Sequence, residues 1–307
     1  MYSISEEWPD FDHEHMRDSN LFTHKKFWNL RESEVDYLPL SFSREDTGEL
    51  IAFFCFAQWN NEWKAPYLAP YFYPYVKKES LLPEILNLLI NYLKNKKHQT
   101  ISITLAPLFL LNEKRMLIDL INAGFTIAEV EVTSYLVVKT GISFIQHIVN
   151  RRKKRRLKSL LGSELSIKEI SNEGWSQYYQ QLVGWRKIKG HQNLISTEFM
   201  DDAKIELPEN FRGLVLNDTY QTLCLAIFIK VNSTCFYVYS LITNPDYPKE
   251  NFPLLLWNAL YEIAQRENIQ FIEMGTSMKK EGLLNKGLLR YKLSVGGRMS
   301  KKYTVQC

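Results

Sequence analysis

Glu273 and Lys292 are the residues of this chain whose types and positions best suit chemistry. Glu273 lies in the run Phe271–Met274, which predicts a central strand, and a carboxylate there is costly to bury unless it is paired or solvated. It could act as a general base or orient an amine. Lys292 precedes the turn Gly296-Gly297, where glycine lets the backbone approach a ligand closely. Structural roles are the alternative: a salt bridge for Glu273, and a solvated helix-end position for Lys292.

A second pair of candidates lies in the run Thr234–Thr243, which also predicts a strand. Tyr237 and Tyr239 alternate with Val238, so both tyrosines should face one side of that strand. Either hydroxyl could donate a proton to a leaving group, and we take Tyr239 as the candidate catalytic residue. The alternative is that each tyrosine fills the core.

The strongest charge feature is a basic run near the middle of the chain. Without its seven lysines and arginines, the formal net charge of +4 would become −3. On a helix these side chains would cover every face, so the run predicts more than the solvated face of an amphipathic helix. Three partners fit: the phosphates of an aminoacyl-tRNA, a CoA or diphosphate-linked carrier, and an anionic membrane surface. A solvated turn between domains is the alternative. The run comprises Arg151, Arg152, Lys153, Lys154, Arg155, Arg156 and Lys158.

An internal repeat predicts the elements that position these residues. Leu50 pairs with Thr222 and Gly124 with Gly296, at an offset of about 172 residues. Each half reads strand, hairpin, strand, helix, strand, helix, strand. The first half has strand patterns at Leu50–Gln58, Tyr67–Val76, Thr100–Leu105 and Thr126–Val138, with helices opening at Pro83 and Asn112. The second has them at Thr222–Val231, Thr234–Thr243, Phe271–Met274 and Met299–Gln306, with helices opening at Pro253 and Glu281.

This order predicts an α/β chain of the α+β mixed-sheet kind, in two tandem units. We place the first domain at residues 1–145, with a leader segment, and the second at 146–307, which carries the candidate active site. A parallel strand–helix–strand crossover leaves a cleft where neighbouring strands diverge, and ligands tend to bind at such strand ends.

The element order resembles the GNAT-type acyltransferase fold, and two tandem copies resemble the FemAB-like family of peptidoglycan-bridge aminoacyltransferases. Two segments carry the resemblance. One is the strand Phe271–Met274 continued by Gly275, similar to the family's acid-x-Gly ending. The other is 287–297, similar to the family's Gly-Leu, aromatic-Lys, spacer, Gly-Gly pattern, with Tyr291 where phenylalanine is usual.

The resemblance implies an acyltransferase that moves an acyl or aminoacyl group onto an amine of a peptidoglycan or polysaccharide precursor of the cell envelope. Its catalytic residues would be Glu273, Lys292 and Tyr239, with Lys292 contacting an anionic group or stabilising developing charge. A CoA-dependent N-acetyltransferase and a non-catalytic module that binds tRNA or anionic envelope carriers are the alternatives. The candidate substrate-binding residues are Arg151, Arg152, Arg155, Arg156, Tyr291, Gly296 and Gly297.

Sequence motifs that are absent limit which cofactors and which cellular location we expect. The Gln/Arg-x-x-Gly-x-Gly/Ala pyrophosphate loop typical of CoA-dependent GNAT enzymes is absent between Asn244 and Pro253, so we expect no tightly bound cofactor, and acyl-CoA or aminoacyl-tRNA would serve as donor substrate. We assign no metal to Asp12–His15. The acidic N-terminus and the short apolar runs predict no signal peptide or transmembrane segment, and the four sparse cysteines favour a reduced, cytoplasmic protein.

Overall fold

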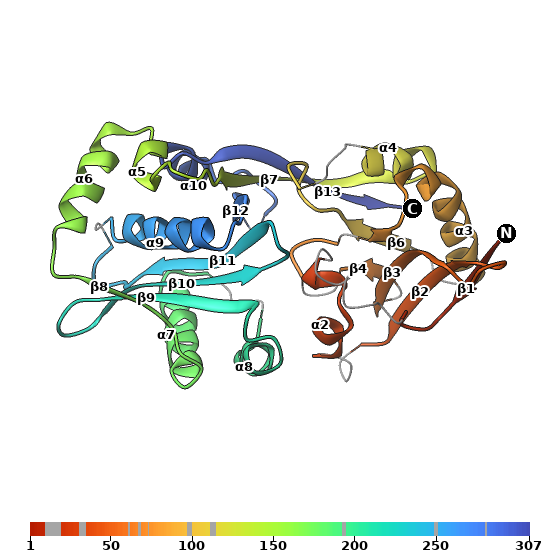
Figure 1. Cartoon of the computed structure of the whole chain (residues 1–307), viewed down its shortest axis with the longest axis horizontal. Coiled ribbons are helices and arrows are strands. Elements are labelled where there is room, and N and C mark those ends of the chain that lie inside the picture. Colours follow the sequence, from red (N-terminus) through yellow and green to blue (C-terminus); the bar gives the residue numbers. More distant parts are fainter. Residues whose placement is uncertain are drawn as a thin grey trace. The chain divides into compact units, whose positions relative to one another are not determined.

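The computed structural model divides into two compact units, and the chain passes between them twice (Figure 1). Unit 1 comprises Met1–Val132 and Ser300–Cys307, and unit 2 comprises Thr133–Met299. The structure describes residues 1–9, 20–30, 35–60, 62–66, 69–72, 74–96, 100–110, 115–191, 195–248, 251–279 and 281–307.

Unit 1 is built on a mixed sheet. Its strands run in the order β1 (Tyr2–Ser5), β2 (Tyr37–Arg44), β3 (Leu50–Trp59), β4 (Glu62–Ala65), β6 (Thr100–Thr104) and β13 (Arg298–Gln306), and β5 (Tyr75–Val76) pairs with β3. The neighbours β4 and β6 are parallel, and α3 (Leu82–Asn95) connects them after η2 (Glu79–Leu81). The remaining described helices are η1 (Leu21–Thr23), α2 (Lys25–Asn29) and α4 (Arg115–Asn122).

Unit 2 repeats this plan. Its strands run in the order β8 (Ser166–Glu169), β9 (Phe211–Asn217), β10 (Thr222–Lys230), β11 (Cys235–Thr243), β12 (Phe271–Thr276) and β7 (Thr126–Val137). Again one neighbouring pair, β11 and β12, is parallel, and α9 (Pro253–Arg266) connects its strands. The other helices are α5 (Phe144–His147), α6 (Arg151–Leu161), α7 (Trp175–Ile188), α8 (Thr197–Glu206) and α10 (Lys286–Ser294).

The two units exchange their last strands. β7 follows α4 in the chain, yet its residues Thr133–Val137 belong to unit 2 and pair antiparallel with β12. β13 follows α10, yet its end pairs antiparallel with β6 in unit 1. The predicted boundary after residue 145 therefore lies inside unit 2, and Ser300–Cys307 belongs to unit 1 instead of the second domain. Each exchanged strand supplies backbone partners to an edge that would otherwise expose unpaired donors and acceptors.

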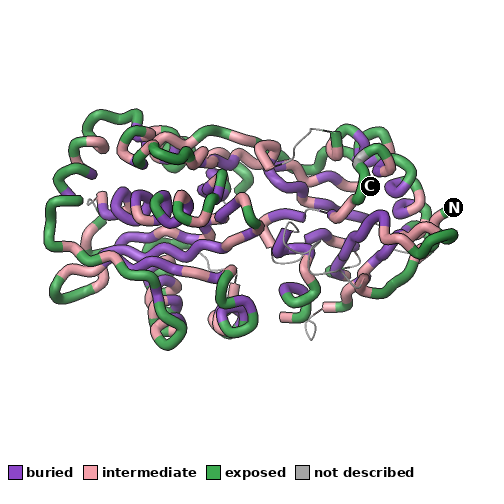
Figure 2. Tube along the Cα trace, in the orientation of Figure 1, coloured by how far each residue is buried: buried purple, intermediate pink, exposed green. Residues whose placement is uncertain are grey.

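Helices cover both faces of the unit 2 sheet, α9 on one face and α7 with α8 on the other (Figure 1). Because both faces are covered, β10 is an almost uninterrupted apolar run in which Leu223–Ile229 is buried. Pro253 begins α9, as predicted, and the buried residues of the helix pack on strands that are largely purple in Figure 2. This rigid core fixes the positions of the strand ends.

Two predicted elements differ from the structure. The partner of β3 in the first hairpin is β4, joined through Asn60 at φ +50°, whereas within the predicted strand Tyr67–Val76 the described part contains only the short β5. The last helix begins at Lys286 instead of Glu281, because Asn285 caps it by accepting a hydrogen bond from the backbone N–H of Leu288.

Candidate functional site

Local irregularities mark the region where β11 and β12 stop pairing. Parallel pairing joins Cys235–Tyr237 to Phe271–Glu273. In β11, Val238 and Ser240 lie opposite consecutive residues of β10, so Tyr239 is the extra residue of a β-bulge. In β12, a second irregularity adds one residue between Glu273 and Thr276 relative to β7. Bulges of this kind re-aim side chains and are enriched beside active sites.

Glu273 lies on an inner strand of the unit 2 sheet, between β11 and β7, and is only 2% exposed. It is in register with Tyr237 of β11 and Tyr135 of β7, so the three side chains share one face. The opposite face carries Ile272 in the core beneath α9. Thr133 Oγ1 lies 3.2 Å from Glu273 Oε1 and 3.0 Å from the carbonyl oxygen of Gly275, and its single hydroxyl proton can serve either acceptor.

Lys292 reaches the same strand end from α10. The side chain is 4% exposed, and Nζ donates to the carbonyl oxygens of Gly275 at 2.6 Å and of Thr276 at 2.8 Å. Gly275 has φ +74°, a conformation that glycine adopts without strain. An ammonium group has three donors, so among the described residues one N–H of Lys292 is left for a ligand.

The electrostatics of Lys292 follow from its burial. Desolvation lowers the pKa of Lys292 to about 8, and the nearby charge of Glu273 acts in the opposite direction. Lys292 is therefore still mostly a cation at neutral pH. The structure thus brings Glu273 and Lys292 together across the chain, one on β12 and one on α10.

Tyr239 is placed differently. Its hydroxyl lies 3.3 Å from the hydroxyl of Tyr179 on α7, and burial, with Tyr179 adding to it, raises the pKa of Tyr239 well above its ordinary value. The bulge turns Ser240 to the same side, where its hydroxyl accepts a hydrogen bond from Arg186 at 3.2 Å. Tyr237, the other tyrosine of this strand, is the one in register with Glu273.

The glycine pair after Lys292 serves internal packing. A Cβ on Gly296, which has φ +97°, would lie 2.5 Å from the carbonyl oxygen of His147. A Cβ on Gly297 would lie 2.7 Å from the carbonyl oxygen of Lys292 and 2.9 Å from the sulfur of Met274. The sequence suggested that the backbone at Gly296 and Gly297 approaches a ligand closely. In the structure this backbone packs closely against other residues of the protein, and the packing holds the end of α10 in place.

The basic run forms α6, and the expectation that its charges cover every face is wrong for one side of the helix. There Leu157 and Leu160 are buried in the core that includes α9, and the charges other than that of Lys153 lie on the outer face and at its sides. Arg156 and Lys154 are half-buried at the sides of the helix. The exposed basic residues of α6 are Arg151, Arg152, Arg155 and Lys158.

Lys153 is the basic residue that turns inward, and it links α6 to α10. Its Nζ lies 3.7 Å from the centre of the Tyr291 ring, a cation–π contact, and desolvation lowers its pKa to about 8. The backbone N–H groups of Val149 and Asn150 both donate to the carbonyl oxygen of Ser294 at 3.2 Å. The start of α6 is thus attached to the end of the helix that carries Lys292.

Two hydroxyls of this region were not predicted. Thr133 contacts Glu273, and Ser277 is fully buried with an Oγ that finds no hydrogen-bond partner in the described part of the chain. A buried hydroxyl without a partner is costly, so a polar ligand or water near β12 would satisfy it. No sequence signal identifies Thr133, because strand β7 comes from the other half of the repeat.

Two further expectations concern metals and membranes. The segment Asp12–His15, to which we assigned no metal, lies outside the described residues. Within the part of the chain that the structure describes, the helices are too short or too polar to cross a bilayer.

Comparisons with known proteins rest on structure, since no protein-family model matches this sequence and no curated protein matches it in sequence. FemX superposes with a TM-score of 0.68 at 11% identity, covering 93% of this chain and 92% of FemX. The fold is that of FemX. A tandem GNAT protein from the clavulanic acid biosynthesis pathway superposes with a TM-score of 0.55 at 8% identity, covering 89% of this chain and 83% of its own.

The same FemX-type fold occurs in the C-terminal domain of a protein assigned as a lysylphosphatidylglycerol synthetase from Agrobacterium fabrum. That domain has a TM-score of 0.61 at 12% identity and covers 95% of this chain and 87% of its own. The predicted fold class, two tandem GNAT-like units on mixed sheets, is confirmed.

Proposed function

We propose that this protein is an N-acyltransferase that moves an acyl or aminoacyl group onto an amine, with its reaction centre at the end of β12. The observation that carries the proposal is the placement of Lys292: a buried ammonium, next to the carboxylate of Glu273, with two of its donors fixed by the carbonyls of Gly275 and Thr276. A donor held in this way needs no reorganisation when charge develops beside it.

The reaction would proceed by addition and elimination at the donor's carbonyl carbon. The acceptor's nitrogen attacks that carbon, and the third N–H of Lys292 donates to the oxyanion that forms. Glu273 accepts the proton that the nitrogen loses. The tetrahedral intermediate then collapses, the new amide is formed, and the bond to the leaving thiol or ribose hydroxyl breaks as that group takes up a proton.

The donor or carrier would be held through its phosphates by α6. The stretch 140–163 contains seven lysines and arginines and no acidic residue, and four of these side chains are exposed along the outer face of α6. Such a face favours a polyphosphate or nucleic acid over a neutral ligand. Because the start of α6 is hydrogen-bonded to the end of α10, an anion bound on α6 would lie on a helix attached to the one that carries Lys292.

The acceptor that we favour is an amine of a cell-envelope precursor, either of peptidoglycan or of a polysaccharide. FemX and the C-terminal domain of a protein assigned as a lysylphosphatidylglycerol synthetase share the fold, and the second of these names describes a phosphatidylglycerol that carries a lysyl group. That name supports an aminoacyl group as the one transferred. We place acyl-CoA second to aminoacyl-tRNA as donor because the CoA pyrophosphate loop is missing from the sequence.

The proposal is tested by incubating the purified protein with small-molecule amines from a cell lysate and, in separate reactions, with charged tRNA or acyl-CoA. Mass spectrometry then identifies amines that gain an acyl or aminoacyl mass. We expect a product that depends on one donor and disappears in Glu273→Gln. Stabilisation by CoA in a thermal-shift titration would instead identify a CoA-dependent enzyme. No modified amine with either donor would count against any transferase.

A further inference from the structure

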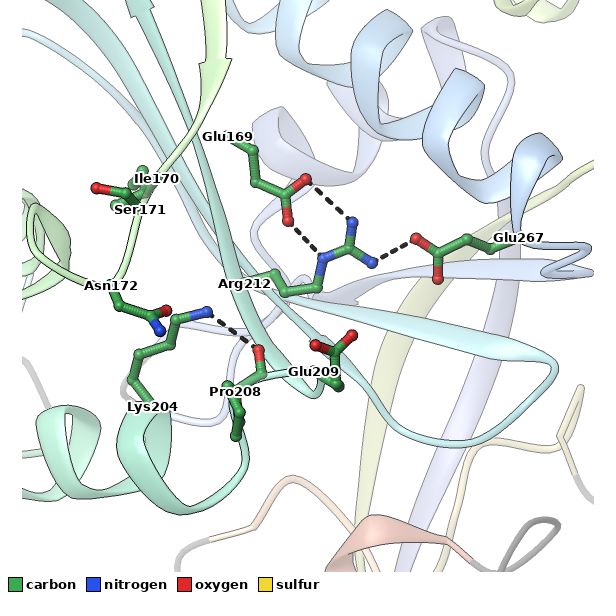
Figure 3. A pocket seen from close by; sticks show the side chains of 9 residues that line it. All are labelled: Glu169, Ile170, Ser171, Asn172, Lys204, Pro208, Glu209, Arg212 and Glu267. Atoms are coloured by element: carbon green, nitrogen blue, oxygen red, sulfur yellow. Dashed lines mark hydrogen bonds and ion pairs between the residues drawn. The ribbon is translucent and has the colours of Figure 1, made fainter.

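A second polar site lies in unit 2, in a pocket of about 410 Å³ between β8, β9, α8 and the end of α9 (Figure 3). This pocket and Lys292 lie at opposite ends of β12. Glu267, which lines the pocket, follows α9 directly and precedes the start of β12, whereas Lys292 donates to a carbonyl at the last residue of β12. The pocket therefore has no part in the proposed acyl transfer, and its ligand is a separate question.

Arg212 forms one wall, and its charge is already neutralised. Glu169 binds the guanidinium at two points, with distances of 2.6 and 3.1 Å, and Glu267 binds it at 2.5 Å. The second oxygen of Glu267 accepts from Lys230 at 3.0 Å. Two cations and two carboxylates thus form one network, and Figure 3 shows Arg212 with its two carboxylates. Because its members satisfy one another, this network supplies a rigid wall and is a poor binding group for a further ion.

Lys204, on the opposite wall, is not neutralised in this way. The side chain is 8% exposed, and its Nζ donates to the carbonyl oxygen of Pro208 at 3.0 Å (Figure 3). The same Nζ lies 5.4 Å from the centre of the Trp175 ring. Within the described chain, no carboxylate forms an ion pair with Lys204. A buried ammonium with two donors left over is costly unless an anion meets it.

Groups of the opposite polarity line the mouth of the same pocket. Glu209 is exposed, and its charge acts on Lys204 together with the charges of Glu169 and Arg212; neither carboxylate forms an ion pair with Lys204 in the described chain. Asn172 adds an amide that both donates and accepts. The pocket therefore presents a buried cation and, at its mouth, an anion, with room for a small molecule between them.

We propose that this pocket binds a small zwitterion of the α-amino-acid type, with its carboxylate on Lys204 Nζ and its ammonium group at Glu209. The carboxylate takes the two donors that Lys204 has left, and Glu209 selects for the positive group. The neutral wall of Arg212 and its partners excludes a second charge, so dicarboxylates and phosphates fit less well than a zwitterion.

The proposal is tested by ligand-observed saturation-transfer NMR with the proteinogenic L-amino acids, followed by titration of any that bind. For each of these, the analogue without the amine and the analogue without the carboxylate are titrated as well. We expect saturable binding of one or more amino acids and weaker binding of both analogues. No saturable binding of any amino acid would overturn the proposal, and so would an amine-free analogue that binds equally tightly.

Variants locate the site. Lys204→Met and Glu209→Gln should each weaken binding about ten-fold or more, as expected for charged hydrogen bonds, whereas Lys168→Met, an exposed lysine of β8, should leave it unchanged. Glu209 is on the surface, so Glu209→Gln is informative even if Lys204→Met fails to fold. Binding that survives both changes would overturn the assignment. Lys292→Met should retain it, which separates this site from the proposed transferase.

Discussion

Lys292 Nζ donates a 2.6 Å hydrogen bond to the carbonyl oxygen of Gly275, so a helix of unit 2 is attached to the irregular end of the inner strand β12. Gly275 has φ +74° and Lys292 is 4% exposed. The bond holds an ammonium group where two strands stop pairing. In this arrangement one contact both positions α10 and keeps a cation ready at a strand end.

Replacing Lys292 by methionine should abolish most of the transfer while substrate binding changes little. Loss of one oxyanion donor lowers kcat by about 100- to 1,000-fold, and KM should stay within a few-fold. Steady-state kinetics with the donor identified by the amine screen gives both values. Lys302→Met is the matched control, since Lys302 is also a buried lysine, bonded to Pro70 and Glu131 in unit 1. An equal fall in kcat in both variants would assign Lys292 a structural role.

The pKa of Lys292 predicts how stability changes with pH. Burial lowers this pKa to about 8 from an ordinary value of 10.5, so between these values the unfolded chain binds the proton more readily. Stability should therefore rise with pH across this window, by up to about 3 kcal/mol, relative to Lys292→Met. Urea unfolding of both proteins at several pH values measures the difference. Burial also lowers the pKa of Lys153, but Lys153 is present in both proteins, so its contribution cancels in the difference between their stabilities. A difference that stays constant with pH would contradict the lowered pKa.

Gly296→Ala should destabilise the fold strongly. The new methyl group would meet the carbonyl oxygen of His147 at 2.5 Å in a backbone conformation with φ +97°. Strain and overpacking together are expected to cost about 4 kcal/mol. Gly282→Ala is the control, because Gly282 also has a positive φ, +73°, but faces open space, and should cost about 1 kcal/mol. Denaturant unfolding compares them, and equal effects would show that the contact with His147 is not tight.

Thr133→Val should lower the stability of the fold, whereas Ser134→Ala, at the neighbouring residue, should leave the stability unchanged or raise it. Thr133 donates to Glu273 or Gly275 inside unit 2, and removing its hydroxyl takes a buried hydrogen bond from these acceptors, which costs about 1 kcal/mol. The Ser134 hydroxyl is buried and has no hydrogen-bond partner in the described part of the chain, so its removal should be neutral or stabilising. Thermal unfolding tests both. A neutral Thr133→Val would show that Glu273 does not depend on this donor.

The outer face of α6 should bind nucleic acid in a salt-dependent way. Neutralising Arg151, Arg152, Arg155 and Lys158 with glutamine should weaken binding of bulk tRNA. It should also reduce the slope of log K against log salt by about 0.7 to 0.9 for each phosphate that the variant no longer binds. The melting temperature should stay unchanged, since these side chains are exposed.

The control for α6 removes the same charge from elsewhere on the surface, by changing Lys168, Lys187, Arg266 and Lys279 to glutamine. This variant should keep the tRNA affinity of the original chain. Equal losses of affinity in the two variants would mean that net charge, and not the surface of α6, governs binding.

Much of the architecture is readable from the sequence because it depends on local patterns. Alternation and apolar runs predicted β10 and β11, and Pro253 predicted the start of α9. The strand that pairs with β3 in the hairpin was harder to predict, because the turn at Asn60 is short and aromatic residues continue beyond β4. Aromatic side chains favour strands in general, and in this segment that preference did not decide the structure.

The candidate site divides in the same way. Its acid and its lysine are visible in the sequence, since a carboxylate in an apolar strand and a lysine before a glycine pair are local signals. Tyr239 and Tyr237 cannot be ranked in this way, because only the folded structure shows that Tyr237 is in register with Glu273 whereas Tyr239 contacts Tyr179 of α7. Likewise the inward turn of Lys153 depends on the packing of α6 against α9 and α10.

The repeat, the element types and the clustering of positive charge in α6 were thus determined by the sequence itself, since each depends on neighbours along the chain. The tertiary structure alone decided that β7 and β13 change units, that Thr133 meets Glu273, and that the Gly296-Gly297 pair packs against His147 and Lys292. The reason is physical: an edge strand can hydrogen-bond to any strand of suitable length, and which one it meets depends on the folded geometry of both units.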